Sequence, residues 1–269
     1  MKYLIPGLKA ARVNLLQNDF CAGLPSPTAF LGLAACIAHK LGLDRWKLSV
    51  LPVLHSVDRS IGRLRPAMEA KNGGYVTVEL QEDMTGEVSF SLILDLPEQV
   101  SEIRLAEALT GLRLAGGVIF RDKTKKIELL ADDAKNLVRC ARGFALVPWR
   151  PDGETTCSFG TRDSLRRVAA TLWPDDPKLR KGWRVPVAVG YRLLGTPSLA
   201  PSGSRDASVP HVFAEPGVGI AELVSVRSAR LTNLPPSEFD GLFWSWTSSR
   251  THIVAHSAYL PAEKDSRHE

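Results

Sequence analysis

Four basic side chains are spaced along residues 58–74 in a pattern suited to binding phosphate. This stretch, DRSIGRLRPAMEAKNGG, lacks the hydrophobic periodicity of its neighbours, which both resemble strands. Guanidinium and ammonium groups pair with phosphate oxygens, and arginine also stacks on bases. The stretch therefore predicts a loop or hairpin that projects from a sheet and binds nucleic acid. Its basic residues are Arg59, Arg63, Arg65 and Lys71.

Metal chemistry would need clustered histidine, cysteine or carboxylate ligands, and the sequence offers none at the required spacing. His252 and His256 are four residues apart, but Ile-Val-Ala between them favours a strand and no HExxH glutamate is present. The cysteines form no CxxC pair and are predicted to be reduced thiols. They are Cys21, Cys36, Cys140 and Cys157. We therefore expect no metal and no cofactor.

Catalysis without a metal has a few candidate groups. Ser26 lies in Leu-Pro-Ser-Pro-Thr and lacks the GxSxG elbow of a hydrolase nucleophile. Cleavage of RNA would need a general acid or base beside a bound phosphate, for which His55 and Tyr3 are the candidates. A metal-independent endoribonuclease is therefore the alternative to the function favoured below.

Gly116 and Gly117 lie between a predicted helix and a predicted strand. This is the reverse of the dinucleotide-binding fold, in which the glycines follow a strand and open a helix. A glycine pair also lets a second backbone or a phosphodiester approach closely. Arg113 beside the pair makes the phosphodiester a reasonable option next to a second backbone.

Three aromatic residues near basic ones could stack on bases. They are Phe144, Trp149 and Trp183. Burial in a core is the ordinary role of such side chains, and it is our prediction for all three.

The N-terminal part alternates strands and helices. Ser26 and Pro27 predict a capped helix to about residue 40, because serine accepts N-terminal amides and proline lacks only an amide that would stay unpaired. Strands are predicted at 3–16, 46–57 and 118–120, and a hairpin at 75–80 and 87–94. A helix over 97–110 is expected to bury Val100, Ile103, Leu105, Ala106 and Leu109. This order is close to the βαββαβ unit of ferredoxin-like domains.

The C-terminal part is predicted to be rich in strands. They are expected at 127–130, 142–149, 183–191, 212–213, 220–231 and 253–258, with helical segments at 132–139 and 162–173. Residues 241–246 could form either element, and 198–210 reads as a flexible loop. We expect an α+β protein with a ferredoxin-like domain at 1–150, a β-rich part at 151–260 and a disordered tail at 261–269.

Composition is that of a globular protein: 269 residues, 44% hydrophobic and 23% charged. Since the sequence has no run of 18 apolar residues and no signal peptide, we expect a cytoplasmic protein without membrane contact. Residues 59–71, 121–142 and 161–184 carry net charges of +3, +3 and +4, against +5 for the whole chain. Positive charge is thus concentrated, as a polyphosphate partner requires.

Four segments together resemble one protein family. They are GLPSPTAFLGL at 23–33, LRLAGGVI at 112–119, GFALV at 143–147 and GWRVPVAVGY at 182–191, with a looser match at LFWSW, 242–246. In this order they resemble the Csy-type Cas-five subunit of type I-F CRISPR surveillance (Cascade) complexes. The short segment between Trp149 and Gly182 and the short insertion also suggest a variant subtype.

The resemblance implies a non-catalytic subunit that takes part in antiviral defence. Such a subunit binds the 5′ handle of the CRISPR RNA and caps the filament of Cas-seven backbone subunits, with a large subunit where present and target DNA as an indirect partner. The family has a ferredoxin-like domain of the repeat-associated superfamily with a projecting thumb, which falls at about 58–74. The implied RNA-binding residues are Asn14, Ser26, Arg59, Arg63, Arg65, Lys71, Arg113, Gly116, Gly117 and Arg142.

Overall fold

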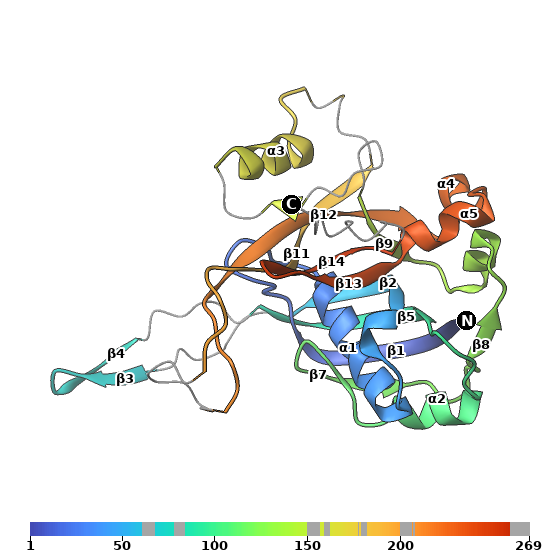
Figure 1. Ribbon diagram of the computed structural model, residues 1–269, viewed down its shortest axis with the longest axis horizontal. Coiled ribbons are helices and arrows are strands. Elements are labelled where there is room, and N and C mark those ends of the chain that lie inside the picture. The colour runs from blue at the N-terminus through green and yellow to red at the C-terminus, as the bar shows by residue number, and fades with distance from the viewer. Residues whose placement is uncertain are drawn as a thin grey trace, which may run out of the picture.

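The structure is a mixed α/β fold built on one large antiparallel sheet (Figure 1). The computed structural model describes residues 1–60, 68–77, 84–149, 157–158, 162–176, 178, 182–199, 206 and 208–258. Twelve strands belong to the sheet, and ten of them follow the order β10-β12-β11-β14-β13-β2-β5-β1-β7-β6, while β8 pairs with β1 and β9 pairs with β12 and β2. Across the described residues, none of the helices has the length and apolar character needed to span a bilayer.

The N-terminal half follows the predicted order of strands and helices. Its elements are β1 (Lys2–Asn14), α1 (Pro27–Leu41), β2 (Ser49–Arg59), β5 (Thr85–Asp95), α2 (Glu102–Ala108), β6 (Arg113–Leu114) and β7 (Gly117–Arg121). In the sheet, β1 lies between β5 and β7, and β2 pairs with the other edge of β5, all antiparallel. The assignment of this arrangement to the ferredoxin-like class stays a prediction.

The helix α1 begins as its sequence predicts. Ser26 Oγ accepts the Ala29 amide at 3.1 Å, and Pro27 takes the first helical position. Gly42 ends the helix with φ of 76°, a left-handed conformation that suits glycine. Phe30 is fully buried and meets Phe90 of β5 edge to face, with ring centroids 5.6 Å apart. The apolar face of α1 therefore covers the sheet.

The C-terminal half closes part of the sheet on itself. Its elements are β8 (Glu128–Leu130), β9 (Phe144–Pro148), β10 (Cys157–Ser158), α3 (Arg162–Leu172), β11 (Trp183–Leu193), β12 (Ala214–Ser225), α4 (Ala229–Thr232), α5 (Pro236–Phe239), β13 (Trp244–Ser248) and β14 (His252–Ser257). Among the described residues, 3-10 helices lie at Arg45–Lys47, Ala134–Arg139 and Asp240–Leu242.

Two strands, β9 and β13, pair with the same edge of β2. Val53 and Leu54 pair with β9, whereas Ser49 and Val50 pair with β13. The pairs β9-β12, β12-β11, β11-β14 and β14-β13 complete a hydrogen-bonded circuit. Trp244 Nε1 donates to Leu146 O at 2.8 Å and joins β13 directly to β9. Strands from both predicted parts of the chain thus belong to one sheet.

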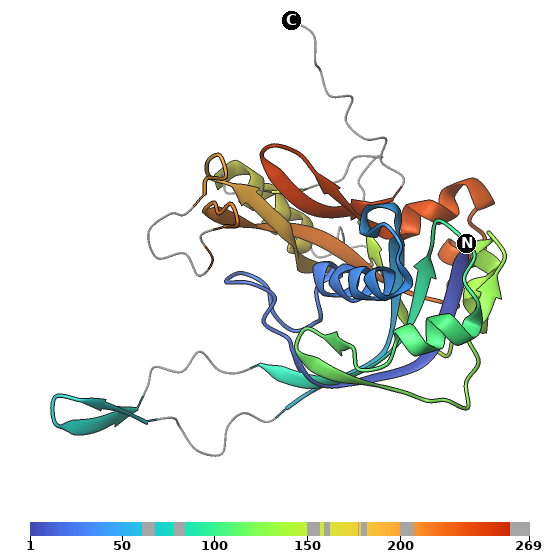
Figure 2. The same cartoon turned by 60° about the horizontal axis from the view of Figure 1, so that its bottom comes forward.

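A hairpin of β3 (Met68–Lys71) and β4 (Gly74–Thr77) projects from the body of the molecule (Figures 1 and 2). Asn72 and Gly73 form its two-residue turn, with φ of 52° and 78°. The prediction that residues from 75 onward pair with β5 is wrong for the described residues, because Asn-Gly favours a tight turn that folds β4 back onto β3. Instead, β5 lies between β1 and β2.

Other local expectations differ from the structure. Ile103, predicted to be buried, is 73% exposed, because α2 is short and buries only Leu105 and Ala108. The strand predicted at 220–231 ends at Ser225, where Ser228 caps α4 through the Arg230 amide. Residues 241–246 contain a 3-10 turn followed by β13. The predicted tail at 261–269 and part of the loop at 198–210 lie outside the described residues.

Candidate nucleic-acid interface

One end of the sheet collects several of the predicted RNA-binding residues. In the register, Val13 lies opposite Gly86, which lies opposite Arg59, and the Asn14 amide donates to Ala115 O at 3.0 Å. The ends of β1 and β2, the start of β5 and the turn between β6 and β7 therefore meet. We call this region the strand-end surface and define it by its exposed residues Arg12, Asn14, Arg59, Arg113 and Gly116.

The two glycines of this region have different surroundings. Gly116 is exposed with φ of 83°, and no heavy atom lies within 4 Å of the position that a Cβ would take. A Cβ on Gly117 would lie 2.7 Å from Ala11 O and 2.9 Å from Val13 N. Gly117 is thus required for packing against β1, and only Gly116 offers open backbone to a ligand.

Arg113 and Asn14 also support the local backbone. The Arg113 guanidinium donates to Gly116 O at 2.9 Å, and Asn14 Oδ1 accepts the Leu16 amide at 2.9 Å. Both residues are exposed. These contacts hold the side chains near the turn between β6 and β7, where they can reach a partner from solvent.

Arg12 is a member of this surface that the sequence analysis missed. Its φ is 59°, and the register of β1 against β5 shifts between Ala10 and Val13. This β-bulge turns the exposed Arg12 side chain away from the regular alternation. The sequence carries a signal for this bulge. The spacing between the buried apolar residues of β1 changes from two, between Leu8 and Ala10, to three, between Ala10 and Val13.

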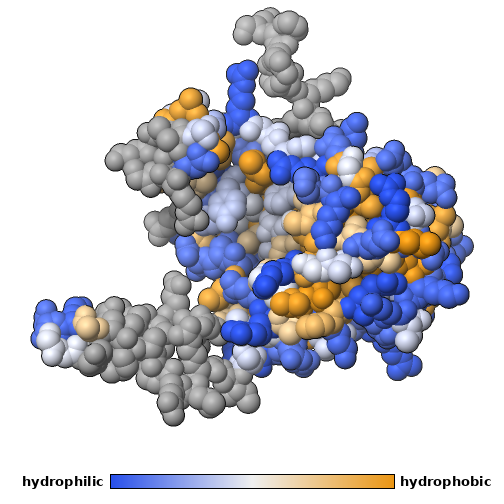
Figure 3. Space-filling model, turned by 90° about the horizontal axis from the view of Figure 1, so that it is seen from below, coloured by the Kyte–Doolittle hydropathy of each residue, from blue (hydrophilic) through white to orange (hydrophobic). Residues whose placement is uncertain are grey.

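The remaining predicted residues lie elsewhere or are already bonded. Ser26 is buried, and its hydroxyl is occupied by the helix cap and by Thr28 Oγ1 at 2.7 Å. Lys71 lies beside the hairpin turn, away from the strand-end surface, and Figure 3 shows that the described tip is mainly hydrophilic. Arg63 and Arg65 lie outside the described residues.

Arg142 lies beside the start of β9, where it accompanies an exposed aromatic pair. Phe144 stacks on Trp183, with ring centroids 5.0 Å apart and 17° between the ring planes. Trp183 is 62% exposed and Phe144 is 36% exposed, so the prediction that both are core residues is wrong. Trp149 is partly buried against the cluster that holds Val168, with the Arg184 guanidinium 4.7 Å from its ring centre.

The two candidate acid–base residues are engaged in the fold. Tyr3 is 2% exposed, and its hydroxyl bonds to both the amide and the carbonyl of Val100 at 2.9 Å. His55 Nδ1 lies 2.9 Å from Arg142 O, and Nε2 lies 2.8 Å from Ser91 Oγ. Among the described residues, the contacts of Tyr3 and His55 give no support to the endoribonuclease alternative. Within the described residues, no cluster of His, Cys, Asp or Glu is suited to a metal.

His55 should make stability depend on pH. Burial lowers its pKa below the ordinary 6.5, and the charge of Lys125 adds to this, against the raising effect of the bond to Arg142. The unfolded chain therefore binds a proton more readily, so the free energy of unfolding should fall as pH drops below about 6.5. His55→Gln should reduce this fall in urea denaturation at pH 7 and pH 5. The exposed His39→Gln is the control, and identical pH dependence of both variants would contradict the assignment.

Two comparisons connect this chain with known proteins. Residues 154–255 match the family model described as CRISPR-associated protein (Cas_Csy2). The chain is also 25% identical over 318 residues to CRISPR-associated protein Csy2 of Pseudomonas aeruginosa (strain UCBPP-PA14), covering 94% of this chain and 97% of that protein. The Cas-five assignment is not tested by these matches. Both similarities support a Csy2-like CRISPR-associated protein.

Proposed function

We propose that this chain is a non-catalytic Cas-five-type subunit of a type I-F or variant CRISPR surveillance complex. It binds the 5′ handle of the CRISPR RNA and caps the Cas-seven backbone filament. The similarity to Csy2 supports the CRISPR context. The observation that carries RNA binding is that exposed Arg12, Arg59 and Arg113 lie at the same end of the sheet as the open Gly116. Arginines spread over the ends of neighbouring strands suit contacts with successive phosphates of one strand.

The arrangement of the N-terminal half supports a ferredoxin-like domain as part of this proposal. The strand order β2-β5-β1-β7 is fully antiparallel, and helices follow β1 and β5. The strand β7, whose outer side pairs only with the two-residue strand β6, and the adjoining turn are open to solvent at Val118, Phe120 and Gly116. The RNA would therefore pass the strand ends and leave α1 in its structural role.

The projecting hairpin supports a role as the thumb of the family. Arg59 lies at its base and Lys71 at its tip, so basic residues mark both ends of the projection. In the proposed complex the hairpin contacts RNA and the adjoining Cas-seven subunit. A large subunit, where present, and target DNA would be further partners of the assembly.

The proposal predicts weaker binding of the RNA handle when the strand-end arginines are removed. Arg12→Ala, Arg59→Ala and Arg113→Ala combined should lower affinity and make it less sensitive to salt. Each phosphate contact to a single strand contributes about 0.7 to the slope of log affinity against log salt, so the slope should fall by about 2. Affinities for handle RNA are measured between about 50 and 300 mM salt, because binding through phosphate contacts weakens strongly over this range.

A matched triple variant controls for net charge. Arg45→Ala, Arg192→Ala and Arg250→Ala remove three exposed arginines from other parts of the chain. This variant should keep the affinity and most of the salt slope. Equal losses in the two triple variants would show that overall charge, and not the strand-end surface, governs binding.

A further inference from the structure

The stacked pair of Phe144 and Trp183 presents an aromatic surface to solvent. Phe144 covers one face of the indole, and Trp183 remains 62% exposed. Large aromatic side chains lose favourable burial when they stay in water, so an exposed stacked pair is a candidate contact site. Neither residue belongs to the strand-end surface.

The sheet holds this pair in place from both sides of β12. Phe144 of β9 lies opposite Ser225, and Trp183 of β11 lies opposite Leu223. Directly opposite residues share a face of the sheet, and Ser225 and Leu223 are two residues apart on β12. The two rings therefore project from the same face and meet above β12, so the sheet orients them before a ligand arrives.

A cleft of about 630 Å³ opens beside the indole, and its size suits a nucleoside. It is lined by Gly182, Trp183, Arg184, Val185 and Leu223. Val185 and Leu223 are half-buried and supply apolar surface. The pairing of β11 with β14 extends only over Gly190–Arg192, so within the described chain residues 183–187 have a strand partner on one edge alone.

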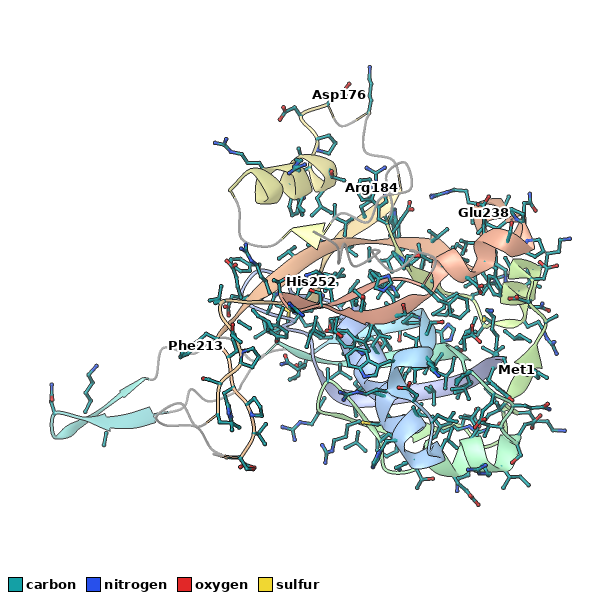
Figure 4. All side chains as sticks on the ribbon, viewed as in Figure 1. Met1, Asp176, Arg184, Phe213, Glu238 and His252 are labelled. Atoms are coloured by element: carbon teal, nitrogen blue, oxygen red, sulfur yellow. The ribbon has the colours of Figure 1, made fainter. Side chains whose placement is uncertain are left out.

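Two described arginines accompany the cleft and the aromatic pair. Arg184 is one of the residues that line the cleft. Figure 4 shows Arg184 near the start of β11, far from Phe213 at the other end of the β11–β12 ribbon. Arg142 is exposed two residues before Phe144, and the bond of its carbonyl to His55 fixes the backbone there. An aromatic face with arginines around it suits an anionic ligand that has planar rings.

We propose that Trp183 stacks an unpaired base of single-stranded nucleic acid and that Arg142 pairs with a neighbouring phosphate. Stacking on an aromatic ring tolerates any base, so this contact binds without reading sequence. Uncharged apolar partners would gain nothing from the surrounding arginines, which is why a nucleic-acid strand fits better than an apolar peptide. The inference rests on the proposed function only in supposing a nucleic-acid partner.

The test compares the full-length protein with its Trp183→Ala variant on strands that lack the handle sequence. Three decamers serve as probes: oligouridylate, oligodeoxythymidylate and an abasic strand with the same number of phosphates. The wild type should bind at least one base-containing strand about tenfold more tightly than the abasic strand, in line with stacking of one base. Trp183→Ala should abolish most of this preference and leave the salt slope unchanged, because no charge is removed.

Two further variants keep the test decisive. Trp183→Phe retains a stacking ring and should keep most of the preference, which separates stacking from loss of folding. Trp46→Ala removes another exposed tryptophan, whose ring centre lies 5.0 Å from the Arg45 guanidinium, and it should behave as wild type. The uridylate and thymidylate arms show whether RNA or DNA is preferred. An unchanged preference in Trp183→Ala, or no preference in the wild type, would overturn the proposal, whatever the strand-end arginines do to handle binding.

Discussion

Replacing Lys2 by methionine is expected to lower the free energy of unfolding by about 3 kcal/mol. Lys2 is only 7% exposed, and its Nζ lies 2.7 Å from Asp132, 2.8 Å from Asp240 and 3.3 Å from Asp95. Its ammonium group also lies over the rings of Phe239 and Phe243. Methionine would fill the space but leave Asp132 and Asp240 without the Lys2 cation, while Asp95 would keep only its contact with the Met1 ammonium at 2.9 Å.

The ammonium group stays charged over the whole accessible pH range. Burial alone would lower the pKa of Lys2, but hydrogen bonds to Asp132 and Asp240 and the charges of Asp95 and Asp240 raise it well above the ordinary 10.5. A raised pKa in the folded state contributes stability that is complete below the pKa of the unfolded chain. The loss in Lys2→Met should therefore be the same at pH 7 and pH 9.

Urea denaturation followed by circular dichroism measures this loss. Lys9→Met is the matched control, since Lys9 is an exposed lysine on the same strand, and its effect should stay within about 0.5 kcal/mol. A loss below about 1 kcal/mol in Lys2→Met would show that Asp132 and Asp240 are solvated well enough without the Lys2 ammonium.

Removal of the Arg230 side chain is expected to cost about 2 kcal/mol, because it leaves a buried carboxylate without its cation. Glu222 is 6% exposed, and both of its oxygens accept from the Arg230 guanidinium at 2.8 Å. This pairing raises the pKa of Arg230 through the hydrogen bond to Glu222. Arg230→Ala therefore acts mainly through the desolvated Glu222, and urea denaturation at pH 7 measures the loss.

A double variant separates the buried charge from the loss of packing. Glu222→Leu combined with Arg230→Leu removes both charges and should be more stable than Arg230→Ala alone. If the double variant is the less stable of the two, the unpaired carboxylate of Glu222 is not the cause of the loss in Arg230→Ala. The ion pair of Glu222 and Arg230 also lies next to the cleft beside Trp183. A Cβ at Gly182, the residue before Trp183, would collide with Glu222 Oε1.

Local elements were largely predictable because their signals are local. The cap of α1 depends on Ser26 and Pro27 alone, and the alternating pattern of β1 and β5 needs only neighbouring residues. The Asn72-Gly73 turn carried an equally local signal, since this pair favours a two-residue hairpin. The sequence analysis did not predict this turn, because apolar and polar residues also alternate from residue 75 onward in a way that suits pairing with β5.

The candidate interface was predictable by residue type and only in part by position. Arg59, Arg113 and Gly116 were expected to contact RNA, and the register of β1, β2 and β5 brings them to one end of the sheet. Arg12 joins them only because a bulge turns it outward. Gly117 and Ser26, expected at the same surface, serve the packing against β1 and the cap of α1.

The amino-acid sequence by itself determined most of the strands, the capped helix and the concentration of positive charge, since each depends on residues close together in the chain. Only the tertiary structure decided that β9 and β13 share one edge of β2 and that Phe144 meets Trp183 across β12. Strand partners are chosen by contacts between residues far apart in the chain, and a period-two pattern shows which side of a strand is buried without showing what covers it. For this reason Phe144 and Trp183, two aromatic residues of the kind usually found in a core, could form an exposed pair that the sequence did not predict.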